Sequence, residues 1–163
     1  MTEYIELNSR NDFTLKELQD AVNRKAFLHM AYEENDPYGY VGEGKERRYI
    51  SRYDYTKPLG LIRSDHYNDK NTFLSDGGIL EGIGEFRQIA YDDEGDGSPA
   101  YSVLEHKGSG RLFMAQGTYS SWDTSEWYDI TDEVVPVEVK VIRYKTNKGD
   151  YIYPLPLKEI DNG

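Results

Sequence analysis

The second half of the chain consists of short strand-like segments separated by turns. Residues 85–91, 101–106 and 111–119 each favour extended backbone, because they mix aromatic and branched residues in short runs. Residues 92–99 and 107–110, which separate them, are rich in the Gly, Asp, Ser and Pro of reverse turns. Three strands joined by two such turns predict an antiparallel β-meander.

One helix is predicted near the N-terminus. Thr14 and Glu17 have the spacing of a capping box, and Phe13 and Leu18 have that of a hydrophobic staple. Apolar residues then recur on one helical face, which predicts an amphipathic helix over residues 15–29. The fold class is therefore α+β, a mainly antiparallel β-sheet meander with one N-terminal helix packed on it.

The most regular two-residue period lies near the C-terminus. There Val135, Val137, Val139 and Val141 alternate with other residues, so residues 134–144 are predicted to form an internal strand with these valines buried. A turn at residues 147–150 leads to a predicted edge strand at residues 151–153, which precedes two prolines.

The middle of the chain gives shorter signals. Residues 33–48 predict a loop region with a short hairpin, and residues 49–55 and 59–63 predict short strands. Residues 77–84 carry four glycines, but no Lys-Ser/Thr follows them as a phosphate-binding loop requires. We therefore expect a mobile or tightly turned connection there.

Length and charge limit what the chain can bind. A chain of 163 residues supports one core, so we expect a single domain over residues 1–163. Thirty acidic against 19 basic residues leave a formal charge of −11, which repels phosphate backbones and anionic lipid. We expect no direct contact with nucleic acid or membrane.

The absence of cysteine excludes disulfides, thiolate metal sites and cysteine nucleophiles. The first residues lack the basic and apolar stretches of a secretory signal, so we expect a cytoplasmic protein. No cofactor motif is present, and no cofactor is expected.

Two further features suggest a metal site or a catalytic residue, but an ordinary structural role explains each of them better. The acidic run from Asp92 to Gly97 suggests a calcium loop, but position twelve of an EF-hand falls on Val103. His66 lies in a polar segment with Asp65 and Asp69, which leaves open a general acid or base. Nearness in sequence does not orient side chains, so a small enzyme using His66 is the least favoured alternative.

Tyrosine is unusually frequent, with 15 residues beside two tryptophans. Amphipathic rings of this kind are enriched at protein interfaces. The densest group mixes four aromatic and three acidic side chains without a basic one. We predict that it binds a partner, the alternative being cross-strand packing at one end of the sheet; its residues are Tyr119, Trp122, Asp123, Glu126, Trp127, Tyr128 and Asp129.

Part of the C-terminal half resembles the C-terminal module of small uncharacterised proteins from tailed phages and their bacterial hosts. The resemblance covers residues 117–123, Glu126-Trp127 and residues 134–141. That resemblance implies a module that ends a sheet and a phage origin, and it carries over no catalytic residue.

Three functions remain open. The favoured one is a non-enzymatic binding protein, a phage or mobile-element accessory factor that inhibits a host defence protein, with mimicry of DNA as one version. Its partner is then a host protein, and in the DNA-mimic version that host protein is one that binds nucleic acid. The first alternative is a protein that binds or sequesters a nucleotide or sugar; the second is the His66 enzyme. A homo-oligomer is compatible with all three.

Overall fold

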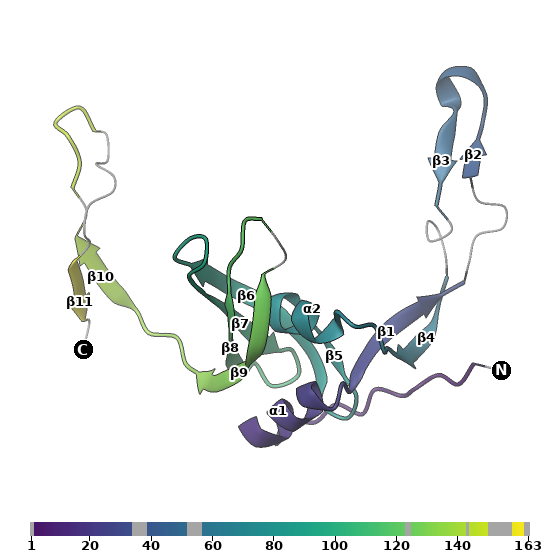
Figure 1. Cartoon of the computed structure of the whole chain (residues 1–163), viewed down its shortest axis with the longest axis horizontal. Helices are drawn as coiled ribbons and strands as arrows, with labels where there is room; N and C mark the ends of the chain where they lie inside the picture. The colour runs from purple at the N-terminus through teal and green to yellow at the C-terminus, as the bar shows by residue number, and fades with distance from the viewer. Residues whose placement is uncertain are drawn as a thin grey trace.

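A seven-stranded antiparallel sheet forms the body of the protein (Figure 1). The computed structural model describes residues 2–33, 39–51, 57–122, 125–142, 144–149 and 158–161. The strand order is β4-β1-β5-β6-β7-β8-β9, and the last five strands are consecutive in the chain. Their bounds are β1 (Phe27–Tyr32), β4 (Pro58–Arg63), β5 (Gly77–Leu80), β6 (Gly84–Asp93), β7 (Pro99–His106), β8 (Leu112–Thr118) and β9 (Glu126–Val134). The predicted meander and α+β class are confirmed.

Helix α1 (Leu15–Asn23) begins where the capping box predicts. The Thr14 side chain accepts a hydrogen bond from the Glu17 backbone N–H, 3.1 Å away, which satisfies one of the free donors at the helix start. Leu18, Ala21 and Val22 are buried and join the core. The predicted packing of an N-terminal helix on the sheet is confirmed.

The predicted end of this helix at residue 29 is wrong. Lys25 adopts a left-handed conformation with φ of 60°, and the N–H groups of Lys25 and Ala26 bond back to the carbonyls of Val22 and Ala21. This is a Schellman ending, in which a lysine occupies the position usually held by glycine. Residues 27–32 instead form β1, so His29 lies in a strand and not at the helix end.

Residues 77–80, which begin with Gly77 and Gly78, do not form the expected connection. They form β5, which pairs with β1 on one side and β6 on the other. A Cβ on Gly77 would lie 2.4 Å from the Phe86 carbonyl oxygen, so glycine is required for the strands to approach this closely. Only residues 81–83, between β5 and β6, make the tight turn.

The predicted internal strand over residues 134–144 is also wrong. β9 ends at Val134, and Val135 and Val137 are each 79% exposed. The strand resumes as β10 (Val139–Ile142), which pairs only with β11 (Lys158–Asp161) in a separate two-stranded sheet. Pro136 lacks an N–H for continued pairing. The side chain of Val141 and residues 151–153 lie outside the described part of the chain.

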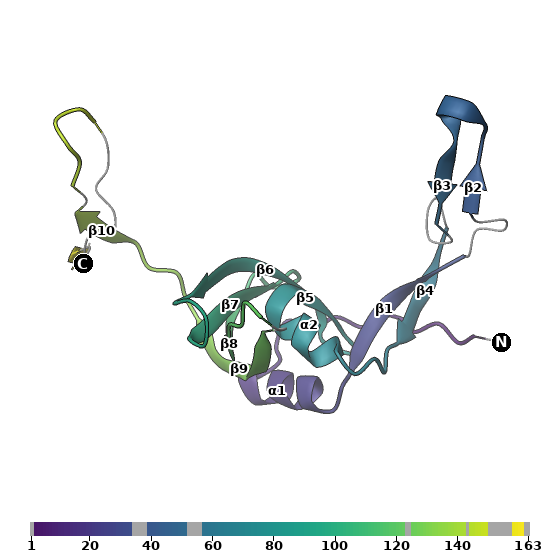
Figure 2. The same ribbon diagram turned by 45° about the horizontal axis from the view of Figure 1, so that its top comes forward.

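The short hairpin predicted in residues 33–48 is present, but it spans residues 39–50 and so extends beyond the predicted range. It consists of β2 (Gly39–Val41), the 3₁₀ helix η1 (Gly44–Glu46) and β3 (Arg48–Ile50). The strand predicted over residues 59–63 is present as β4. Of the strand predicted over residues 49–55, residues 49–50 belong to β3, and residues 52–55 lie outside the described part of the chain. In both views the β2–β3 and β10–β11 pairs stand away from the body at opposite ends (Figure 2).

Helix α2 (Asp69–Asp76), which the sequence did not predict, lies across the sheet and contacts β5 to β9. Its Phe73 and Leu74 complete a core shared with α1.

The two helices also cover the outer edge of β9. The Asn71 side chain accepts a hydrogen bond from the Trp127 N–H at 2.9 Å, and the Gln19 side chain donates to the Ile130 carbonyl at 2.7 Å. Among the described residues, neither α1 nor α2 has the length and apolar composition that crossing a bilayer requires.

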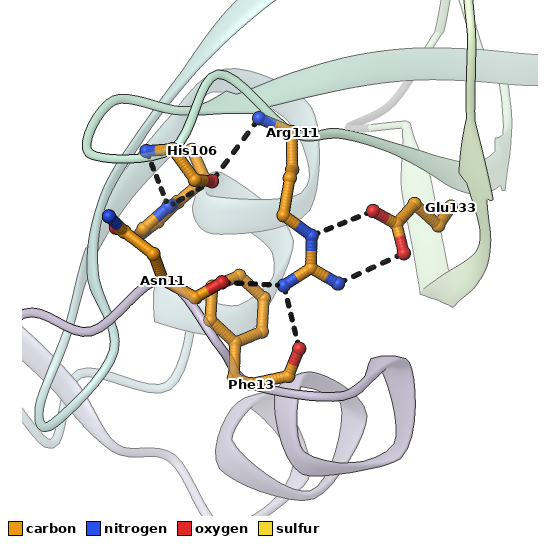
Figure 3. Close-up of polar contacts among 6 residues, drawn as sticks. Asn11, Phe13, His106, Arg111 and Glu133 are labelled. Carbon is orange, nitrogen blue, oxygen red and sulfur yellow. Dashed lines mark hydrogen bonds and ion pairs between the residues drawn. The ribbon is translucent and has the colours of Figure 1, made fainter.

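Arg111 joins the N-terminal segment to the sheet (Figure 3). Its guanidinium donates two hydrogen bonds to Glu133, of 2.7 and 2.9 Å, and two more to the carbonyls of Asn11 and Phe13, of 3.0 and 2.7 Å. It also lies over the ring of Phe13, 4.4 Å from the centroid. The paired charges lower the pKa of Glu133 and raise that of Arg111, in each case chiefly through the shared hydrogen bonds.

His106 is the one buried histidine among the described residues, and its ring tautomer follows from its neighbours. Nε2 lies 2.9 Å from the Ile83 carbonyl, which can only accept, so Nε2 carries the proton. Nδ1 then accepts from the Ser109 hydroxyl and the Ser109 N–H, at 2.7 and 3.2 Å. The ring therefore ties the end of β7 to two turns and packs against Phe13.

Arg111→Lys is expected to lower the free energy of unfolding by about 1–2 kcal/mol, because lysine keeps the charge but has three N–H donors on a single nitrogen and cannot replace the four hydrogen bonds of the guanidinium. Arg87→Lys is the matched control, since Arg87 pairs with Glu105 alone in an exposed position. Urea denaturation measures both. Equal stability of Arg111→Lys and wild type would show that the guanidinium geometry is unimportant.

The lowered pKa of Glu133 predicts an acid-dependent loss of stability. Its contribution is present above the ordinary glutamate value of 4.5 and is lost as the pH falls through the lower folded value. Glu133→Gln should therefore be less stable than wild type at neutral pH, and the difference should shrink between about pH 5 and pH 3. Thermal melts across this range test the sign; a constant difference would contradict it.

Candidate functional site

The turn between β6 and β7 and the loop between β8 and β9 lie side by side at one end of the sheet. The N–H of Gly97 donates to the Tyr119 carbonyl at 2.9 Å, and the N–H of Tyr119 donates to the Ser98 carbonyl at 3.0 Å. The Ser121 N–H donates to the carboxylate of Asp96 at 2.9 Å. We call the described residues 92–98, 119–122 and 125–126 the acidic end.

The two tryptophans of the predicted binding group are separated by the fold. Trp122 lies on the loop of the acidic end and is 93% exposed. Trp127 lies in β9, is only 7% exposed and belongs to the core cluster, against which Tyr119 packs as a partly buried residue. Trp127 therefore serves packing, the alternative that the sequence left open, while Trp122 is free to contact a partner. Asp123 lies outside the described residues.

The other predicted residues are divided in the same way. Glu126 is exposed at the start of β9. Tyr128 is half exposed, and its hydroxyl lies 2.5 Å from that of Thr118. Asp129 is partly buried and accepts hydrogen bonds from the Ile130 N–H, at 2.8 Å, and from the side chain of Asn23 in α1, at 3.3 Å. Glu126 and Tyr128 are thus available at the surface, and Asp129 mainly fixes α1 against β9.

Charge at this end has one sign. The sequence has no lysine or arginine between Arg87 and Lys107, or between Arg111 and Lys140. The end of β6 and the β6–β7 turn contribute four carboxylates that the sequence had suggested only as a calcium loop: Asp92, Asp93, Glu94 and Asp96. Over the residues that the structure describes, no three acidic or histidine side chains gather as a metal ion requires. The hydrogen bond between Asp96 and the Ser121 N–H instead brings this acidic segment next to the loop that carries the exposed Trp122.

A cleft of about 330 Å³ opens beside the acidic end, between α2, β6 and β9. Its lining consists of Asn71, Ser75, Asp76, Gln88, Tyr91, Ser125 and Trp127. Burial raises the pKa of Tyr91 to about 12, and a hydrogen bond to Asp93 adds to this, so the phenol is neutral at physiological pH. The cleft could not be predicted from the sequence, because α2, which forms one of its walls, was not predicted.

His66 is exposed, and its ring stacks on Tyr67 with 4.5 Å between centroids. Its Nδ1 accepts the Asn68 N–H at 3.2 Å. Of the described carboxylates none contacts the ring; Asp69 instead accepts a hydrogen bond from Ser64 at 2.6 Å. A second cavity, of about 190 Å³, is lined by Ser64, Asp69 and His29 but not by His66. The geometry gives His66 no group that would activate it.

No family model, curated protein or solved structure matches the chain. The resemblance of residues 117–141 to a phage module therefore stays a prediction.

The different burial of the tryptophans predicts different effects on stability. Trp127→Ala should lower the free energy of unfolding by about 3–5 kcal/mol, because it leaves a large cavity in the core. Trp122→Ala should leave the melting temperature unchanged. Calorimetry on the two variants measures this; similar losses in both would mean that Trp122 is packed and not exposed.

Proposed function

We propose that the protein is a non-enzymatic binding protein that captures a basic partner through its acidic end. The observation that carries this proposal is the position of Trp122, a 93% exposed indole on a loop that is hydrogen-bonded to Asp96 of the acidic end, with no lysine or arginine nearby in the sequence. A large exposed ring anchors an interface by burying apolar area, and surrounding charge of one sign attracts a partner of the opposite sign.

The chemistry of the acidic end suits a partner protein that itself binds nucleic acid. Such a protein presents lysine and arginine side chains spaced for phosphates, and carboxylates on a rigid turn can occupy the same positions. The hydrogen bonds between Tyr119, Gly97 and Ser98 support this rigidity, because they fix the two loops relative to each other. We further propose, following the resemblance to phage proteins, that the partner is a host defence protein of the cytoplasm and that binding inhibits it.

A second candidate function, the binding of a small ligand, is favoured by the cleft of about 330 Å³ beside the acidic end. Its volume is at the lower limit of ligand pockets and suits one sugar ring, base or side chain. Since Trp127 lines this cleft, its fluorescence reports directly on occupancy by sugars or nucleosides.

The binding proposal predicts separable effects of anchor and charge. With a partner isolated from bacterial lysate at low salt, Trp122→Ala should weaken binding by about 2 kcal/mol or more through faster dissociation. Glu94→Lys should mainly slow association, and this effect should shrink as salt rises. Biolayer interferometry at two salt concentrations measures both rates.

Asp12→Lys is the matched control for charge. Asp12 precedes α1, is exposed and makes no hydrogen bond or ion pair to another described residue, and its replacement changes the net charge by the same amount as Glu94→Lys. If the two reversals slow association equally, the acidic end has no special role and only the total charge of the protein matters. If no basic partner is recovered at either salt concentration, the proposal fails.

A further inference from the structure

The cleft between α2, β6 and β9 offers acceptors of hydrogen bonds and no positive charge. The Gln88 amide nitrogen already donates to the Ser75 carbonyl at 2.7 Å, which leaves the amide oxygen of Gln88 as an acceptor. Asp76, the last residue of α2, has a carboxylate with no hydrogen bond or ion pair to any described residue. Neither lysine nor arginine lines the cleft. A phosphate-bearing ligand would therefore be repelled, and a cation would be attracted.

Aromatic rings form part of the cleft wall. The rings of Tyr91 and Trp127 lie 6.2 Å apart at 59°, and Tyr91 is 44% exposed, so its ring is accessible to a ligand. The face of an aromatic ring carries partial negative charge and attracts a cation. Asp93, which bonds the Tyr91 hydroxyl, adds a second carboxylate close to this wall.

The protein already uses this combination of groups internally. Arg111 lies over the rings of Phe13 and Phe113, at 4.4 and 5.2 Å from their centroids, while it pairs with the carboxylate of Glu133. A planar guanidinium suits such a site better than an ammonium, because it can stack on a ring and bond a carboxylate through two N–H groups at once.

We propose that this cleft binds a guanidinium group, with the cation stacked on Tyr91 and paired with Asp76. The inference rests on the proposed function in one respect: the guanidinium belongs to an arginine of the basic partner, which enters the cleft while Trp122 and the carboxylates of the acidic end contact the surface around it.

The test uses the Trp122→Ala variant, in which Trp127 is the only remaining tryptophan and its fluorescence reports on the cleft. The probes are a blocked arginine, the same arginine within a short peptide, the citrulline counterpart of each, and adenosine. The arginine probes should change the fluorescence with saturation. Citrulline, which has the same shape without the charge, should bind at least about tenfold more weakly.

Two substitutions locate the binding. Asp76→Asn should weaken arginine binding about tenfold or more, whereas Asp12→Asn, an equal loss of charge far along the chain, should not. Tyr91→Phe keeps the ring and should retain binding, whereas Tyr91→Ala should lose it. Circular dichroism confirms that each variant is folded. Equal binding of citrulline and arginine, preferred binding of adenosine, or an unchanged affinity in Asp76→Asn would each overturn the inference.

The outcomes separate this inference from the proposed function. If Glu94→Lys and Trp122→Ala impair partner binding but Asp76→Asn does not, the acidic end is the interface and the guanidinium site is wrong. If the arginine probes bind as expected but Glu94→Lys slows association no more than Asp12→Lys, the cleft stands and the proposed function fails. If a blocked arginine binds as tightly as the peptide, the cleft recognises the arginine side chain alone and makes no further contacts with the rest of the peptide.

Discussion

The bonds of Arg111 hold together parts of the chain that are distant in sequence. One guanidinium bonds Glu133 at the end of β9 and the carbonyls of Asn11 and Phe13, which lead into α1. Phe13, beneath that guanidinium, packs against Phe113, Phe86 and the ring of His106. The position of α1 therefore depends on this residue, and α1 in turn fixes Asp129 and the outer strand that leads from the acidic end.

The same arrangement explains why Trp122 is exposed while Trp127 is buried. β9 is held by β8 on one side and by side chains of α1 and α2 on the other, so Trp127 has no freedom to leave the core. The loop before β9 is instead fixed through backbone hydrogen bonds to the β6–β7 turn. The ring of Trp122 is 93% exposed on this loop, so the bonded loop presents the indole on a defined support.

The sequence predicted the elements whose signals are local. The capping box of Thr14 and Glu17 and the turns of the meander were identified correctly, because each depends on residues a few positions apart. The end of α1 was missed, since Lys25 takes a conformation that glycine usually marks. The valines after β9 show period two, but alternation does not reveal whether a second layer covers the face.

The candidate site was predicted in part. The aromatic and acidic composition of residues 119–129 marks the end of the sheet where Trp122 is exposed, yet the burial of Trp127 depends on α2, whose residues 69–76 have little apolar periodicity. The acidic β6–β7 turn lies on the same surface because Asp96 accepts a hydrogen bond from the Ser121 N–H, about 25 residues away in the sequence. Composition alone does not place such distant segments together.

The side-chain hydrogen bonds along β9 make the two edges of the sheet unequal. An unpaired edge strand is a template on which another β-strand can add, and repeated addition of this kind leads to fibrillar aggregates. Over residues 127–130 the amide side chains of Asn71 and Gln19 bond backbone groups that an incoming strand would need. At the opposite edge, the described N-terminal segment bonds β4 through Ile5 and Leu61. Growth of the sheet by strand addition is therefore blocked beside the acidic end, so that an acidic protein can present an aromatic ring there without aggregating through the adjoining strand.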